Sequence, residues 1–179
     1  DTLRKFVSYK QSHNEIKNAK AGKEAFIIIK VNNLVDDTVI KKLYKASGAG
    51  VKIKLIVRGI CSLIPGIKEI SENIEVISIV DRFLEHNRLF IFCNDGENQY
   101  YLASADWMSR NLDLRIEVAC PVYDKELQNI IRTIIDFQLN DNTKARWINH
   151  KNHNNHKKSK TSKKIQAQMA TYNYFKNQL

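Results

Sequence analysis

A histidine with arginines on both sides is the first place in this sequence where chemistry is expected. His86 has Glu85 beside it, Arg82 four residues before it and Arg88 two residues after it. Guanidinium groups bind phosphate oxygens in a planar fork, and an imidazole can attack phosphorus or move a proton. This combination predicts a site that handles a phosphoryl group. The alternative is an exposed strand edge with ordinary charge pairs.

A second cluster of polar side chains follows further along the chain. Ser104 and Asn111 are candidates to hold phosphate oxygens or to orient the histidine. Glu117 lies in the run 114–120, which we predict to be a buried strand. A carboxylate there would be costly unless it paired with Arg115 or with a histidine. The alternative is a polar turn with one ion pair at a strand edge.

Three more histidines, His150, His153 and His156, are spaced by three residues and would share one face of a helix. Asparagine and lysine surround them without carboxylate partners, so we predict a loop and assign no metal site to this chain. The three cysteines, at positions 61, 93 and 120, are too widely spaced for a metal knuckle or a disulfide framework. Each lies beside apolar residues, which favours small buried side chains in a reducing compartment.

The elements that must position these residues have the pattern of an α/β domain. A β-branched run at 25–31 predicts a buried strand, a helix is predicted to begin at 36–37, and a second strand covers 51–57. Strand, helix and strand with short joints form a βαβ unit with parallel pairing. Arg58 follows the second strand at its carboxyl end, where ligand sites of open α/β sheets form.

The rest of the chain adds strands and helices around that unit. Four further strand-like runs cover 74–80, 88–93, 99–104 and 114–120, and Asn94-Asp95-Gly96 predicts a hairpin between the second and third. Helices are predicted at 2–21, ending near Gly22, at 124–139 and at 165–175. We divide the chain into a helix or linker from a preceding domain (1–22), an α/β catalytic domain (23–148), and a basic loop with a closing helix (149–179). Because the chain starts with Asp1, we expect it to be a piece of a longer protein.

Positive charge is concentrated at the end of the chain. The net charge is +10, yet residues 1–143 hold 20 basic and 19 acidic residues, whereas residues 144–179 hold nine basic and no acidic ones. Such an arm would attract nucleic acid, anionic lipid or an inorganic phosphate polymer, unless it is only a solvated tail. No apolar run approaches the roughly 20 residues of a membrane helix, and no signal peptide is visible. We expect a cytoplasmic protein, with peripheral membrane attachment as an alternative.

The polar residues also resemble one half of a phospholipase D-type site. His86-x-Arg88 on one strand is followed, after a hairpin, by a serine-containing turn with an asparagine and then a glutamate. In that superfamily two halves assemble face to face and a histidine forms a covalent phosphoryl intermediate. The sequence departs from the nuclease and lipase pattern His-x-Lys-x-x-x-x-Asp, because Arg88 replaces the lysine and Cys93 stands at the aspartate position. This departure argues against an ordinary phosphodiesterase.

Longer strings narrow the resemblance to the C-terminal domain of bacterial polyphosphate kinase. They occur in order and with consistent spacing at residues 32–36, 55–63, 71–74, 78–80, 82–86, 104–108 and 144–146. The resemblance runs from about Phe26 to Arg146 and more weakly through the basic arm. It implies an α/β fold of phospholipase D type, a mixed sheet flanked by helices.

The resemblance also implies roles for single residues. Arg58 resembles the family arginine that contacts nucleotide phosphates. His86 resembles the second active-site histidine, which faces a phosphorylated histidine of the preceding domain; His13 does not match that other motif. With His86 and Arg58 we group Arg88 as ATP- and phosphate-binding, and Arg82, Ser104 and Asn111 as weaker candidates. Glu117 and Arg115 are expected to orient the site.

The family activity is reversible transfer of the ATP γ-phosphate to inorganic polyphosphate. The resemblance implies Mg²⁺ bound mainly by the upstream domain, ATP or ADP and polyphosphate as substrates, and the upstream domains of the same polypeptide as partners. We expect a homo-oligomer at full length, no specific nucleic acid partner, and an isolated chain without turnover. Two alternatives stay open: a phospholipase D-type phosphodiesterase with His86 as nucleophile, and a non-catalytic module that binds polyanions.

Overall fold

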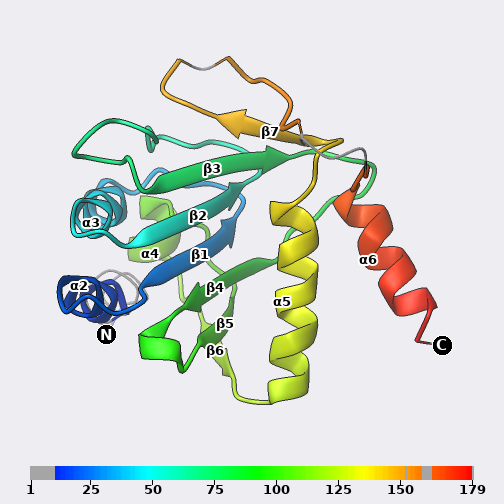
Figure 1. The fold of residues 1–179 in the computed structure, drawn as a ribbon, viewed down its shortest axis with the longest axis horizontal. Helices are drawn as coiled ribbons and strands as arrows, with labels where there is room; N and C mark the ends of the chain where they lie inside the picture. Colours follow the sequence, from blue (N-terminus) through cyan, green and yellow to red (C-terminus); the bar gives the residue numbers. More distant parts are fainter. Residues whose placement is uncertain (1–10, 152, 159–162, 179) are drawn as a thin grey trace.

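A seven-stranded mixed sheet with helices on both faces forms the body of the protein (Figure 1). The structure is a computed structural model that describes residues 11–151, 153–158 and 163–178. The strand order is β6-β5-β4-β1-β2-β3-β7. The predicted α/β class is confirmed. The part of the predicted 2–21 helix that precedes residue 11 lies outside the described residues.

The centre of the sheet is the predicted βαβ unit. β1 (Phe26–Val31) and β2 (Lys52–Val57) pair in parallel, and α3 (Asp37–Gly48) connects them. Asp36 begins the helix because its side chain accepts a hydrogen bond from the backbone N–H of Val39 at 3.0 Å. Helices cover both faces of the sheet, so β1 is almost continuously apolar. All three predicted elements are confirmed.

The strands next to the βαβ unit place the start of β4 beside the carboxyl ends of β1 and β2. β3 (Ile74–Ile79) pairs in parallel with β2, whereas β4 (Arg88–Phe92) runs antiparallel to β1. β5 (Gln99–Ala103) returns from β4 through the short helix η2 (Asn94–Gly96), all of whose residues have positive φ, as the predicted hairpin requires. The start of β4 therefore lies at the edge where β1 and β2 end.

The predicted buried strand at 114–120 is wrong. α4 (Ser109–Leu114) takes up its first residue, and β6 (Ala119–Val122) begins only at Ala119. The apolar residues between them face solvent: Ile116 is fully exposed and Leu114 is 83% exposed. These residues lie outside the sheet, at the end of α4 and in the loop before the edge strand β6, so their apolar sequence does not imply burial.

The opposite edge of the sheet carries a strand that the sequence pattern did not reveal. β7 (Ala145–Ile148) pairs antiparallel with β3. The two helices predicted nearby are confirmed as α5 (Lys125–Leu139) and α6 (Ala167–Lys176). Figure 1 shows α5 lying across one face of the sheet with α6 beside it, and the two helices are in contact.

Two hydrophobic cores lie on opposite faces of the sheet. On one face α2 (Ser12–Lys20), α3 and α4 pack against Ile27, Ile29 and Phe90; on the other face α5 covers Ile28 and Ile91. The described part of the predicted 1–22 linker is thus packed into the domain, since Ile16 of α2 is buried in the first core. The helix ends just before Gly22, as predicted, where φ is +72°.

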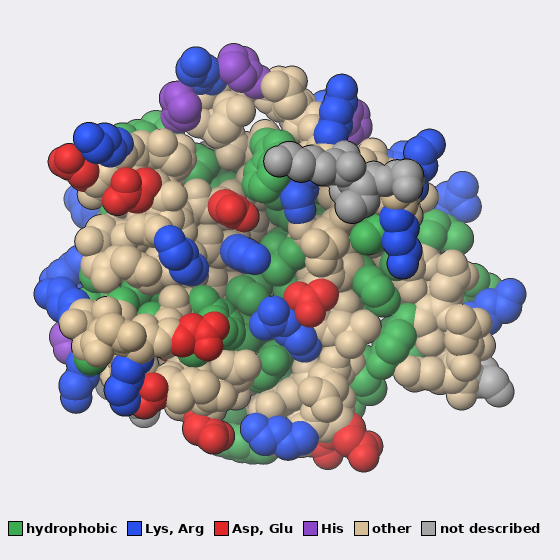
Figure 2. All heavy atoms as spheres, viewed as in Figure 1, with side chains coloured by type: hydrophobic (Ala, Val, Ile, Leu, Met, Phe, Trp, Pro, Cys, Tyr) green, Lys and Arg blue, Asp and Glu red, His purple; other side chains and the backbone are tan. Residues whose placement is uncertain are grey.

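The predictions for the cysteines and the basic arm have mixed outcomes. Cys93 is buried and Cys61 is partly buried, but Cys120 is exposed on β6, so its predicted burial is wrong. The described residues of 149–158 form no helix, and the spacing of the three histidines therefore does not gather them on one helix face. Figure 2 shows histidine, lysine and arginine side chains at the top of the view, where Figure 1 draws the loop that follows β7. Among the described residues, no helix has the length and apolar character needed to cross a membrane.

Candidate active site

His86 stands at the edge of the sheet where strands from different parts of the chain meet. It lies in the loop before β4, two residues ahead of Arg88, the first residue of that strand. Arg58 follows the last residue of β2, and Asp106 lies in the loop after β5. The antiparallel register pairs Arg88 with Ala103, which brings the segment after β5 next to His86. The fold thus gathers residues that are up to 48 positions apart.

Two guanidinium groups flank the exposed imidazole of His86. Nη2 of Arg88 lies 3.0 Å from Nε2, and Nη2 of Arg58 lies 3.4 Å from Nδ1. A guanidinium only donates, and a neutral imidazole has one acceptor nitrogen, so only one of the two contacts is a hydrogen bond at a time. The shorter contact assigns Nε2 as the acceptor and leaves the proton on Nδ1, on the side of Arg58. A phosphate oxygen between Arg58 and His86 would meet donors from both groups.

Arg88 is held in place by the buried carboxylate of Asp106. Its Nε and Nη2 donate to the two oxygens of Asp106 at 3.2 and 3.1 Å, and both side chains are nearly buried. Nη1 donates to the backbone oxygen of His86 at 2.9 Å. Most donors of Arg88 are therefore committed within the protein. Its geometry suits holding the histidine more than binding phosphate.

Asp106 is the main residue that the sequence did not single out. Its carboxylate also accepts hydrogen bonds from the backbone N–H groups of Asn32, at 2.7 Å, and Asn33, at 3.2 Å. Burial raises the pKa of Asp106, but the hydrogen bonds from Arg88 and these amides outweigh it, so the pKa lies below its usual value. The hairpin register was the available signal, because Asp106 lies just beyond the residue that pairs with Arg88.

The residues of the second polar cluster, Ser104, Asn111 and Glu117, form hydrogen bonds with one another. Glu117 accepts hydrogen bonds from Ser104 Oγ and, at 2.8 Å, from Asn111 Nδ2. These partners replace the pairing with Arg115 or a histidine that we expected. Burial raises the pKa of Glu117, but the bonds from Ser104 and Asn111 outweigh it, and the charges of Arg115 and Arg88 lower the pKa further. Ser104 and Asn111 therefore hold the carboxylate of Glu117.

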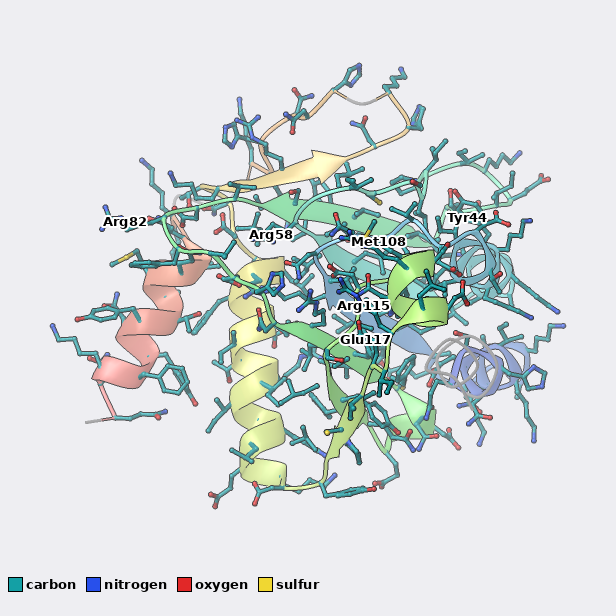
Figure 3. All side chains as sticks on the ribbon, turned by 180° about the vertical axis from the view of Figure 1, so that it is seen from behind. Tyr44, Arg58, Arg82, Met108, Arg115 and Glu117 are labelled. Atoms are coloured by element: carbon teal, nitrogen blue, oxygen red, sulfur yellow. The ribbon has the colours of Figure 1, made fainter. Side chains whose placement is uncertain are left out.

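The predicted arginines divide into two groups. Figure 3 shows Arg58, Arg115 and Glu117 gathered in the middle of the molecule, whereas Arg82 lies apart at its outer edge. Arg82 and Arg115 are both exposed. The second guanidinium beside His86 thus comes from Arg58 and not from Arg82.

The carboxylates around His86 are held by donors of the protein. The nearby carboxylates of Glu85, Asp106 and Glu117 all accept hydrogen bonds from protein donors. Within the described ranges, no group of three or more histidine, cysteine, aspartate or glutamate side chains is placed to hold a metal ion.

Solved structures with this arrangement of strands define the class of the domain. The structure resembles Nuc, a phospholipase D family member from Salmonella typhimurium, with a TM-score of 0.54 over 75% of this chain and 88% of that one. It also resembles NucT from Helicobacter pylori, with a TM-score of 0.51 over 78% and 92% of the two chains. Both are 13% identical in sequence, so they establish the fold alone: an α/β domain of phospholipase D type.

Closer relatives establish the family. The profile of polyphosphate kinase C-terminal domain 2 matches residues 2–168, and the chain belongs to that family. The crystal structure of the polyphosphate kinase from Porphyromonas gingivalis superposes with a TM-score of 0.91 at 46% identity, over 94% of this chain and 26% of that one. The polyphosphate kinases of Vibrio parahaemolyticus and Escherichia coli are 53% and 47% identical over 94% of this chain. The chain spans about a quarter of the length of these relatives, 24% and 25%.

Proposed function

We propose that this chain supplies one half of an active site that moves the γ-phosphoryl group of ATP to inorganic polyphosphate, reversibly. The phosphorylated histidine lies in the part of the polypeptide that precedes this chain, and the chain alone has no turnover. The supporting observation is His86 between Arg58 and Arg88 at the edge of the sheet where β1 and β2 end. Membership of the polyphosphate kinase family supplies the substrates.

Arg58 is the proposed phosphate contact. Phosphoryl transfer spreads charge over the equatorial oxygens, and preorganised donors that meet this charge lower the barrier. The guanidinium of Arg58 is half-exposed beside His86, so a substrate oxygen can reach both. Arg88 is the positioning group, because Asp106 and the backbone of His86 take most of its donors.

His86 is the proposed hydrogen-bond donor to the leaving oxygen. When the bond between the γ-phosphorus and the bridging oxygen of ATP breaks, a bond from that phosphorus to a ring nitrogen of the upstream histidine forms. The leaving oxygen becomes a terminal oxygen of ADP, and an N–H of His86 donates to it. In the next step the phosphoryl group passes to a terminal oxygen of polyphosphate, and the reverse reaction returns it to ADP. Magnesium, bound mainly by the rest of the polypeptide, would neutralise phosphate charge.

We also propose the partners of the protein, its compartment and the role of its basic residues. The partners are the upstream domains and further copies of the full-length protein, and no specific nucleic acid. We place the protein in the cytoplasm, with peripheral membrane attachment as the alternative. The basic residues 144–179 guide polyphosphate toward the site by long-range attraction.

The experiment is His86→Ala in the full-length protein. Loss of a side chain that donates to the leaving oxygen typically lowers turnover by about 10²- to 10⁴-fold, and we expect ATP-dependent polyphosphate synthesis to fall within that range. His13→Ala is the matched control, because this exposed histidine lies on α2 and no role is assigned to it. Synthesis near the wild-type rate in His86→Ala would refute the proposed role.

A further inference from the structure

The loop that carries His86 is held by side chains from other parts of the fold. Residues 80–87 have no helix or strand of their own. They lie between β3 and β4, and two of their residues, Phe83 and Glu85, bind side chains from three separate elements. The position of His86 therefore depends on contacts outside the loop.

The first contact is a largely buried ion pair. Lys30 of β1 donates to Oε2 of Glu85, and the lysine side chain is only 6% exposed. Burial lowers the pKa of Lys30, and the charge of Glu85 opposes that effect. An ammonium at this depth requires a partner, and the only carboxylate bonded to it in the described part of the chain comes from the residue beside His86.

The second set of contacts comes from α5 and from α6, which packs beside it. Gln138 of α5 donates to Glu85 Oε2 at 2.8 Å, and Gln168 of α6 donates to Oε1 at 3.2 Å. The amide of Gln168 also spans the backbone of Phe83, accepting from its N–H at 2.9 Å and donating to its oxygen at 2.8 Å. Gln138 and Gln168 are both buried, so these bonds are shielded from water.

We propose that Lys30, Glu85, Gln138 and Gln168, here called the Glu85 anchor, position His86 for phosphoryl transfer. This inference rests on the proposed function. These four are positioning residues, since they act through the loop and not on the substrate. The helix that closes the chain, α6, is on this reading part of the active site, although it follows His86 by about 80 residues.

The Glu85 anchor fixes the position of the His86 imidazole, and the rate of phosphoryl transfer is sensitive to that position. Glu85 is joined to His86 by one peptide bond, so a shift of its side chain moves the imidazole relative to Arg58, now 3.4 Å away. A misplacement of about 1 Å at a catalytic group can cost roughly 10²-fold in rate. Arg58 follows β2 and is not part of the loop, so nucleotide binding should change less than turnover.

Gln168→Ala in the full-length protein tests the inference. We expect kcat to fall by about 10- to 100-fold with KM for ATP within about twofold of wild type. Amide exchange of residues 80–87 should accelerate while exchange in β1 and β2 stays unchanged. Asn173→Ala, an exposed polar position on the same helix, is the control and should leave kcat and exchange as in wild type.

A second variant, Gln168→Glu, disturbs Glu85 while keeping one contact between α6 and the loop. Gln168→Glu keeps the acceptor for the Phe83 N–H but places a second carboxylate against Glu85, so it should lose kcat as Gln168→Ala does. Wild-type kcat in both Gln168 variants, with His86→Ala inactive, would overturn the anchor and leave the proposed function standing. An activity loss that matches only the unfolded fraction would also overturn the anchor. Full activity of His86→Ala would instead refute the proposed function.

Discussion

Asp106 joins three segments of the chain through one carboxylate. It accepts hydrogen bonds from the backbone of Asn32 and Asn33, after β1, and from Arg88 at the start of β4. Its side chain is 7% exposed, so water contributes little to holding these groups. Arg88 in turn holds His86, and the stability of the loop junction and the geometry of the site therefore share one residue.

Removing this carboxylate should cost both folding and activity. Breaking a buried ion pair typically costs about 3–5 kcal/mol because the remaining charge is left without a partner, and we expect Asp106→Ala to lower the free energy of unfolding by that order. Asp37→Ala breaks an exposed pair with Lys41 and should cost below about 1 kcal/mol. Urea unfolding of both variants measures the difference. Equal, small effects would contradict the account of Asp106.

Two buried aspartates, Asp106 and Asp141, also predict how stability depends on pH. Burial raises the pKa of Asp141, but hydrogen bonds from backbone N–H groups, that of Ala167 first among them, outweigh it, and its folded-state pKa is lowered, like that of Asp106. A lowered pKa contributes stability that is present above the unfolded-state value of about 3.9 and is lost as pH falls through the folded-state value. We expect the unfolding free energy to be flat near neutral pH and to fall below about pH 4. Asp141→Asn should flatten this acid limb in urea titrations; an unchanged limb would contradict the assignment.

The elements that sequence patterns predicted share strong local signals. β1 is a run of β-branched and aromatic residues, and α3 and α5 each begin after an aspartate whose side chain caps the helix. The predictions that were missed or wrong concern the two edges of the sheet. β7 has only four residues, too few for a clear pattern. The apolar run before β6 is exposed because it lies at the end of α4 and in the loop that follows, outside the sheet.

Helix capping gives a test at this scale. Asp124 accepts a hydrogen bond from the N–H of Leu127 at 2.9 Å at the start of α5. Asp124→Ala should lower the unfolding free energy by about 1 kcal/mol, whereas Asp124→Asn, which keeps an acceptor, should lower it by less. Neither variant should change kcat, because the cap lies at the end of α5 opposite Gln138. Equal losses in both variants would show that the cap bond is not the cause.

At the scale of the whole molecule, the site is assembled by topology. The sequence identified Arg58 and His86 as a pair only through the family resemblance, and nothing local in it links Gln168 to Phe83, 85 residues earlier. Those contacts depend on α5 lying across one face of the sheet and α6 packing beside it (Figure 1). Periodicity in the sequence predicts the helices and strands and their order along the chain. It does not predict which side chains from different elements come into contact.

The uneven charge makes a prediction about substrate capture. Lys163 and Lys164 lie in the basic residues 144–179, exposed to solvent. In the full-length protein, Lys163→Gln with Lys164→Gln should raise KM for polyphosphate with little change in kcat, and the effect should shrink in high salt. The matched control is Lys17→Gln with Lys20→Gln on α2, also exposed but in the nearly neutral body. Equal changes in KM for the two double variants would contradict guidance by the arm.

The central claim is that His86 assists the phosphorylation of another histidine. Rapid-quench measurement with ATP labelled in its γ-phosphate tests it directly in the full-length protein. Wild type should carry the label on a histidine outside residues 1–179, and His86→Ala should load that histidine about 10²- to 10⁴-fold more slowly. Loading of His86→Ala at the wild-type rate, or label on a peptide that contains His86, would contradict the claim.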